Sequence, residues 1–254
     1  MELTHELSHF WLLLLVIVAF VAGYVDAIAG GGGMILIPAL LFAGIPAVSA
    51  MAVNKVVAIA GTFLAVIKYA LAKQVSWRLV LWSLLPCLIA SFIGGKAALS
   101  LSDTLLSWMI LLCIPVALYF VLTTRKRSAS GADVKTAKAG VILAPIGFYD
   151  GLLGPGTGTY MTIAMRRFLS MEYLKATATT KPLNLATNIG AAVTFLLAGK
   201  VLWTLAIPML VANAAGAWIG SHFAVKNGDD FIRKMLVIVL VVMLLANVIK
   251  LIAS

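Results

Sequence analysis

Charged residues are scarce in this sequence. They make up 11% of its 254 residues, whereas hydrophobic residues make up 63%. A soluble domain is typically about 25% charged, because charged side chains cover much of its water-facing surface. The shortage of charge therefore excludes a soluble enzyme and a disordered chain, and it favours a protein that crosses a lipid bilayer several times.

Cysteine and histidine are also rare. Cys87 and Cys113 lie inside apolar runs without a CxxC partner, and none of the three histidines has metal-site spacing. These absences exclude a disulfide scaffold, and we expect no metal and no cofactor. The net charge of +10 lies in short loops between apolar runs, not in a basic–aromatic motif, so nucleic acid is not an expected partner.

Hydrophobic runs cover most of the chain, and a lipid-embedded run of this kind must be helical. At roughly 20 residues per crossing, we predict an all-α integral membrane protein with about eight to ten hydrophobic helical segments. The predicted segments cover residues 10–28, 34–42, 48–71, 79–99, 105–122, 139–153, 159–168, 176–197, 202–225 and 231–253.

The second part of the chain repeats the first. Gly23-Tyr24-Val25-Asp26 recurs as Gly147-Phe148-Tyr149-Asp150 at an offset of 124 residues, and later matches keep an offset of 126. The later matches are Lys55/Lys181, Val75/Val201, Trp77/Trp203, Gly94/Gly220 and Asp103/Asp229. This pattern predicts two membrane repeats, residues 1–122 and 139–254, joined by a polar linker at 123–138.

The positions of basic residues predict the orientation, because Lys and Arg concentrate in cytoplasmic loops. With the linker in the cytoplasm, most of the 19 Lys and Arg residues fall on the same side, and only Lys96, Lys200 and Lys250 fall opposite. Each repeat then crosses an odd number of times, so the repeats have inverted topology and both termini are periplasmic. The first apolar run lacks a basic N-terminal flank, so we expect it to be retained as a span.

Glycine interrupts one hydrophobic run in each repeat, at residues 30–33 and again at 154–158. Such a break cannot be a stable helix facing lipid, and we expect either two short helices or a re-entrant pair. The backbone N–H groups that a broken helix exposes attract anions. The substrate-binding candidates here are Gly31, Gly32, Gly33, Gly156, Thr157 and Gly158. The alternative is a tight turn for close helix packing, which recurrence in both repeats disfavours.

Four charged residues lie inside the predicted membrane segments. Asp26 and Asp150 precede the glycine breaks, and Lys55 and Lys181 lie in the long segments that follow. A charge at this depth is costly unless it faces a cavity or a partner. We predict that the two lysines bind an anion and that the two aspartates carry a coupling ion or form salt bridges. The alternative is a purely structural Asp–Lys salt bridge within each repeat.

Polar neighbours accompany both lysines. Asn54 precedes Lys55, while Asn184 and Asn188 follow Lys181, and their amides are further substrate-binding candidates. Pro182 disfavours helical geometry at the residue before it, so we also expect a helix break beside Lys181. Gly216, Gly220 and Gly94 have the spacing of close helix–helix contacts.

These motifs resemble those of the sulfite exporter TauE/SafE family. The motifs are residues 23–33, Ile37-Pro38-Ala39-Leu40-Leu41 and Asn54-Lys55, with a degenerate second copy at 147–158, and the resemblance covers nearly the whole chain. It implies a multi-pass transporter of the bacterial inner membrane for small anions, mostly sulfite, organosulfonates and related sulfur compounds.

We therefore expect a secondary transporter, not an enzyme, that moves a small sulfur-containing anion by alternating access, coupled to H⁺ or Na⁺. The sequence leaves a homo-oligomer open. One alternative is a passive anion channel. Another is an intramembrane aspartyl enzyme, in which two carboxylates share a proton. The Gly-x-Gly-Asp run usual in such enzymes is missing at both glycine breaks.

Overall fold

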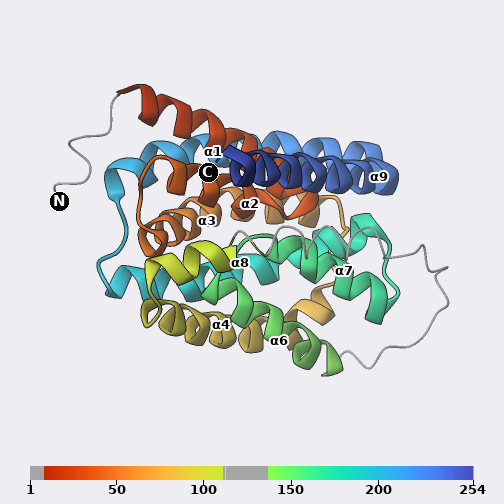
Figure 1. The fold of residues 1–254 in the computed structure, drawn as a ribbon. Helices are drawn as coiled ribbons and strands as arrows, with labels where there is room; N and C mark the ends of the chain where they lie inside the picture. Colours follow the sequence, from red (N-terminus) through yellow and green to blue (C-terminus); the bar gives the residue numbers. More distant parts are fainter. Residues whose placement is uncertain (1–8, 111, 113–136, 254) are drawn as a thin grey trace.

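The computed structural model describes residues 9–110, 112 and 137–253, which form helices joined by short connections, with no strand among these residues (Figure 1). The helices are α1 (His9–Ala29), α2 (Gly32–Phe42), α3 (Ala47–Leu71), α4 (Trp77–Leu99), α6 (Ala137–Leu152), α7 (Thr157–Leu169), α8 (Tyr173–Leu197) and α9 (Trp203–Ala253). Residues 103–110 are also helical, and α9 is divided at Gly228. The all-α prediction is confirmed. Most of the predicted segment 105–122 and of the linker lies outside the described residues, as does Cys113.

Within the described residues, four helical stretches are long and apolar enough to cross a membrane: His9–Ala29, Ala47–Leu71, Trp77–Leu99 and Trp203–Met235. Leu81, Leu197 and Val141 are among the large apolar side chains that point outward, as lipid-facing residues do. In contrast, α2 and α7 have 11 and 13 residues. At about 1.5 Å per residue they are too short for a hydrocarbon layer about 30 Å thick. The chain is a multi-pass membrane protein with two short helices inside it.

The first glycine break is a reversal of the chain. Gly30 has a φ of 76°, and α2 then runs back along α1. A Cβ atom placed on Gly32 would lie 2.7 Å from the carbonyl oxygen of Ala22 and from Cβ of Asp26. The second break, between α6 and α7, reverses the chain in the same way (Figure 1). Each break is therefore a re-entrant helix pair, one of the two arrangements that the sequence predicts.

The two halves of the chain exchange packing partners. α1 packs against α9 and α4 packs against α6, so each contact joins one helix from each half. A Cβ atom on Gly220 would lie 2.3 Å from the carbonyl oxygen of Tyr24, and one on Gly94 would lie 2.1 Å from that of Phe148. The predicted close contacts at these glycines are confirmed. The same pairing in both halves is what a repeat predicts, and inverted topology stays a prediction.

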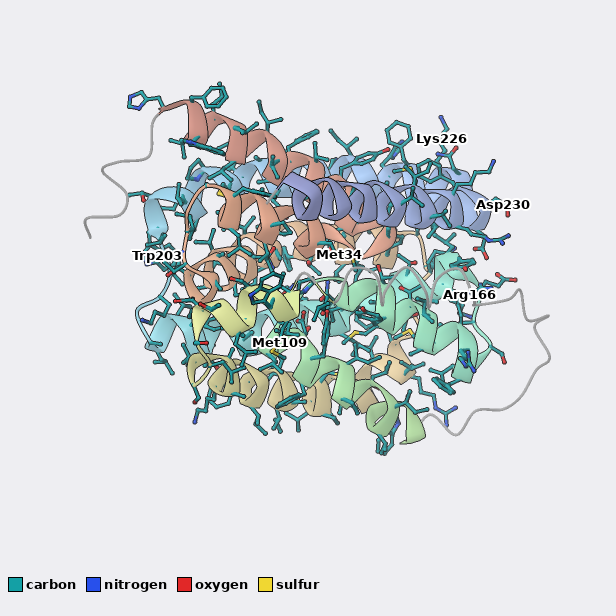
Figure 2. All side chains as sticks on the ribbon, viewed as in Figure 1. Met34, Met109, Arg166, Trp203, Lys226 and Asp230 are labelled. Carbon is teal, nitrogen blue, oxygen red and sulfur yellow. The ribbon has the colours of Figure 1, made fainter. Side chains whose placement is uncertain are left out.

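The connections between helices gather at two ends of the bundle. The α3–α4 and α7–α8 connections lie at one end, and the α8–α9 connection lies at the other (Figure 1). Arg166 and Lys226 lie at the first end and Trp203 at the second (Figure 2). The first end is the one predicted to face the cytoplasm.

Asp103 and Asp229, matched by the repeat, each cap a helix. The Asp229 carboxylate accepts backbone N–H groups of Tyr173 and Leu174 at the start of α8, both at 2.8 Å. Asp103 accepts one, from Val48 of α3, at 2.9 Å in an exposed setting. We expect Asp229→Ala to cost about 1–2 kcal/mol of unfolding free energy. Asp103→Ala should cost less. Thermal unfolding of the purified variants would check this, and equal losses would contradict it.

Candidate functional site

Each buried lysine pairs with an aspartate of the other half. Nζ of Lys55 on α3 lies 2.6 Å from Oδ1 of Asp150 on α6. Nζ of Lys181 on α8 lies 3.1 Å from Oδ2 of Asp26 on α1 and also donates to the Asp26 backbone carbonyl. The predicted alternative of a salt bridge within each repeat is wrong about the partner. The reason is the exchange of helices, because α1 and α6 each pack with the opposite half. We call these contacts the crossed ion pairs.

The crossed ion pairs differ in exposure. The side chains of Lys55 and Asp150 are 1% and 2% exposed, and that of Lys181 is fully buried. Asp26 is the most accessible of the four, at 16%. Separating a buried pair strands a charge where water cannot solvate it. The Lys181–Asp26 pair is therefore the easier of the two for an entering ion to open.

The two re-entrant turns touch each other beside the crossed ion pairs. Thr159 donates its backbone N–H to the carbonyl oxygen of Gly30 at 3.3 Å and its hydroxyl to that of Ala29 at 2.8 Å. A Cβ atom on Gly30 would lie only 2.4 Å from the carbonyl carbon of Gly158. The start of α7 is thus bonded directly to the end of α1.

A small polar cavity lies at this meeting point. Its volume is about 20 Å³, which is room for about one water molecule. Nine of the predicted site residues line it: Asp26, Gly33, Asn54, Lys55, Asp150, Thr157, Gly158, Asn184 and Asn188. Gly30, Ala58 and Gly154 line it as well. Gly30 and Gly154 belong to the predicted glycine breaks, whereas no pattern singles out Ala58. We call this space the central cavity, and it is too small for a sulfur oxyanion in this conformation.

The other predicted site residues lie just outside the central cavity. Gly31 precedes α2, and the backbone N–H of Gly32 points to Oδ1 of Asp26 at 3.3 Å. Gly156 packs against the methyl group of Met34. Lys181 reaches the cavity only through Asp26. The structure thus brings both lysines into one network but turns several of the predicted glycines away from it.

The predicted helix break at Pro182 is wrong, because α8 continues without interruption from Tyr173 to Leu197. Proline removes one backbone hydrogen bond, a loss that a helix packed among other helices can tolerate. Pro182 is buried among such neighbours. The continuous helix holds Lys181 and Asn188 at fixed positions along one element.

The Asp150 carboxylate is only partly satisfied. Its Oδ1 atom accepts the ammonium group of Lys55 and the hydroxyl of Thr157, the latter at 2.5 Å. Lys55 also donates to Oδ1 of Asn188 at 3.3 Å. The Oδ2 atom of Asp150 is buried and has no hydrogen-bond partner among the described residues. An unused carboxylate oxygen beside a polar cavity can take up a proton or bind a small cation.

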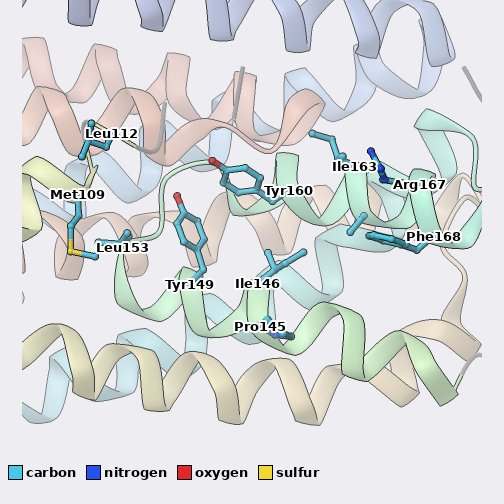
Figure 3. A pocket seen from close by; sticks show the side chains of 11 residues that line it. Met109, Leu112, Pro145, Ile146, Tyr149, Leu153, Tyr160, Ile163, Arg167 and Phe168 are labelled. Atoms are coloured by element: carbon cyan, nitrogen blue, oxygen red, sulfur yellow. The ribbon is translucent and has the colours of Figure 1, made fainter. Parts of the chain in front are cut away.

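A larger groove of about 770 Å³ is lined by Met109 and Leu112 and by residues of α6 and α7 (Figure 3). Its lining includes Met109, Ile146 and Phe168, and it is apolar apart from Arg167 and two tyrosines. The tyrosines, Tyr149 and Tyr160, meet edge to face with ring centroids 5.2 Å apart. The Tyr149 hydroxyl donates to the carbonyl oxygen of Pro155 at 2.5 Å, so it supports the turn before α7. This groove offers a small anion few polar partners.

A multi-pass helical bundle with two re-entrant pairs meeting at buried ion pairs has the architecture of a membrane transporter. The chain belongs to the sulfite exporter TauE/SafE family, whose model matches residues 15–246. This family consists of membrane transporters, a class of protein distinct from enzymes.

Curated relatives agree with this assignment. A protein of Sinorhizobium sp named "Probable membrane transporter protein ORF9" is 37% identical over 92% of this chain and 91% of its own length. The "Probable membrane transporter protein YfcA" of Escherichia coli strain K12 is 36% identical over 89% of this chain and 85% of its own. "Probable membrane transporter protein YunE" of Bacillus subtilis is 26% identical over 88% and 89%. No solved structure matches the chain significantly.

Proposed function

We propose that this protein is a secondary transporter that moves a small sulfur-containing anion, such as sulfite or an organosulfonate, by alternating access. The observation that carries the proposal is the crossing of the two ion pairs between halves around the central cavity. An anion that draws a lysine away from its aspartate loosens a contact between the halves. Binding is then coupled directly to their relative movement.

The charges of the site support coupling of the anion to a second ion. Two lysines and two aspartates balance, so an anion that enters alone adds an uncompensated charge in a poorly solvated place. A proton on Asp150, or a sodium ion at its Oδ2 atom, restores neutrality and frees Lys55 for the anion. We therefore propose that the anion moves together with H⁺ or Na⁺.

The small size of the central cavity fits an occluded state between two open ones. An open channel needs a continuous polar path, whereas here the described residues close around about 20 Å³. We place the protein in a bacterial inner membrane with both termini periplasmic and residues 123–138 cytoplasmic. The choice of membrane rests on the family, and the orientation rests on the distribution of Lys and Arg among the connections.

A ligand screen of the purified protein tests the substrate. The six probes are sulfite, thiosulfate, sulfate, taurine, isethionate and sulfoacetate. A ligand that binds the folded state stabilises it by about 2.7 kcal/mol at 100 times its dissociation constant, so the matching anion should raise the unfolding temperature. Lys181→Gln should abolish this rise, because the glutamine carries no charge.

Proteoliposomes loaded with the matching anion then test the coupling. We expect uptake against an anion gradient only when a H⁺ or Na⁺ gradient is imposed. Uptake that only follows the anion's own electrochemical gradient would instead establish a channel. If none of the six probes stabilises or is transported, the assignment to sulfur anions is wrong.

A further inference from the structure

Among the residues that the structure describes, Arg166 is a buried cation without a counter-ion. Its side chain lies in the last turn of α7 and is 8% exposed. No carboxylate among the described residues forms an ion pair with it. The guanidinium donates one long hydrogen bond, 3.4 Å from Nη1 to the carbonyl oxygen of Met171, and its Nε atom has no partner. The ring of Tyr173 covers one face, 3.5 Å from Cζ.

The Asp229 carboxylate forms no ion pair with Arg166. It accepts the backbone N–H groups of Tyr173 and Leu174 at the start of α8. Burying a guanidinium group without a partner costs free energy. Stacking on an aromatic ring offsets only part of such a cost. An oxyanion held by the guanidinium would supply the missing charge and hydrogen bonds.

Hydroxyl groups continue from Arg166 along the contact between α7 and α8. Thr177 is buried one turn after Tyr173, and its hydroxyl has no partner. Further along, the Thr162 hydroxyl donates to that of Thr180 at 3.4 Å. Thr180 immediately precedes Lys181, which pairs with Asp26. We call this line of residues the α7–α8 polar seam: Thr162, Arg166, Tyr173, Thr177 and Thr180.

The described part of the first half has no such seam. At the repeat offset of 126 residues, Ala47 stands in place of Tyr173 and Met51 in place of Thr177. The short helix α2, which matches α7, contains no charged residue. The repeated fold therefore does not require a buried arginine or these hydroxyls. Their presence in one half alone points to a role at one end of the bundle.

We propose that Arg166 and Thr177 form a second anion subsite, which receives the sulfite or sulfonate group at the end of the bundle that carries the α7–α8 connection. From there the anion moves along the seam to Lys181, four residues or about 6 Å beyond Thr177 on α8. The planar guanidinium suits this ligand because it donates two parallel hydrogen bonds to oxyanions. The inference rests on the proposed transport function and adds the path by which the anion arrives.

Sided transport tests the subsite. Inside-out and right-side-out vesicles would be supplied with the probes sulfite and isethionate, and the half-saturating concentration measured for each face. Arg166→Gln and Thr177→Val should raise it roughly tenfold at the face with the α7–α8 connection, as loss of a charge-assisted hydrogen bond does. The value at the opposite face should not change. Arg166→Lys should recover part of the loss, and the exposed neighbour variant Arg167→Gln should match wild type.

A purely structural role for Arg166 gives a different result. The unfolding temperature would fall and the maximal rate would drop at both faces, without a sided change in half-saturation. That outcome, or an Arg166→Gln variant like wild type at both faces, overturns the subsite while the central site stands. If the wild-type protein transports neither probe in either orientation, the proposed function fails for these anions and the subsite fails with it.

Discussion

Lys55→Met is expected to cost about 3–5 kcal/mol of unfolding free energy, the loss typical when one partner of a buried ion pair is removed. Methionine has nearly the length of lysine, so the change leaves little empty space. It leaves the Asp150 carboxylate with the Thr157 hydroxyl as its remaining side-chain donor. The unfolding temperature of the purified variant measures the loss.

A second substitution, added to Lys55→Met, tests which aspartate forms the ion pair with Lys55. Adding Asp150→Asn to Lys55→Met removes the stranded carboxylate and should restore most of the stability. Adding Asp26→Asn should lower stability further, because it also leaves Lys181 unpaired. Rescue by Asp26→Asn instead would mean that the pairs form within each half. The rescued double variant should remain inactive in transport, since it has lost both charges of one pair.

Gly30→Ala should have the second large effect, because it combines a steric clash with a strained backbone. The new methyl group would lie 2.4 Å from the carbonyl carbon of Gly158, and Gly30 has a φ of 76°. The backbone at Gly30 or at Gly158 can relieve this clash only if one of the two re-entrant turns moves. Overpacking typically costs about 1–3 kcal/mol, and a left-handed conformation about 1–2 kcal/mol. We expect these costs to add, with loss of transport.

Two matched variants separate these costs. Gly44→Ala has nearly the same φ, 81°, but no atom within 4 Å of the new methyl group, so it tests the conformation alone. Gly158→Ala places a methyl group 2.5 Å from Cα of Gly30 without a positive φ, so it tests the clash alone. The unfolding temperature should be highest for Gly44→Ala, lower for Gly158→Ala and lowest for Gly30→Ala. A Gly30→Ala variant no worse than Gly44→Ala would show that the two turns do not touch.

Hydropathy and the repeat predict most of the fold, because lipid leaves the helix as the main option for an apolar run. The predicted segment 48–71 corresponds to α3, and 79–99 to most of α4. The repeat also picks out both lysines and both aspartates, since an intramembrane charge is conspicuous in sequence. The match between Asp103 and Asp229 identified two equivalent residues whose capping role only the structure shows.

The pairing within the site could not be predicted in the same way. A repeat makes Lys55 equivalent to Lys181 and Asp26 equivalent to Asp150, so pairing within and between halves is equally consistent with the sequence. The choice depends on how α1 and α6 pack, which involves residues far apart in the chain. Arg166 is a similar case. A basic residue beside a connection is already explained by the concentration of Lys and Arg in cytoplasmic loops, so the sequence gives no reason to expect a binding role. Its burial against Tyr173 exists only in three dimensions.

The exchange of helices between halves has a consequence for biosynthesis. A ribosome completes the first half before α6, α8 and α9 have been made, so α1 is inserted without the helix that it finally packs against. Asp26 and Lys55 meanwhile lie in the bilayer without their counter-ions, which is costly for as long as it lasts. The nascent first half therefore cannot settle into its final form. A chain whose translation stops between Lys55 and Asp150 would therefore carry both residues without their final partners.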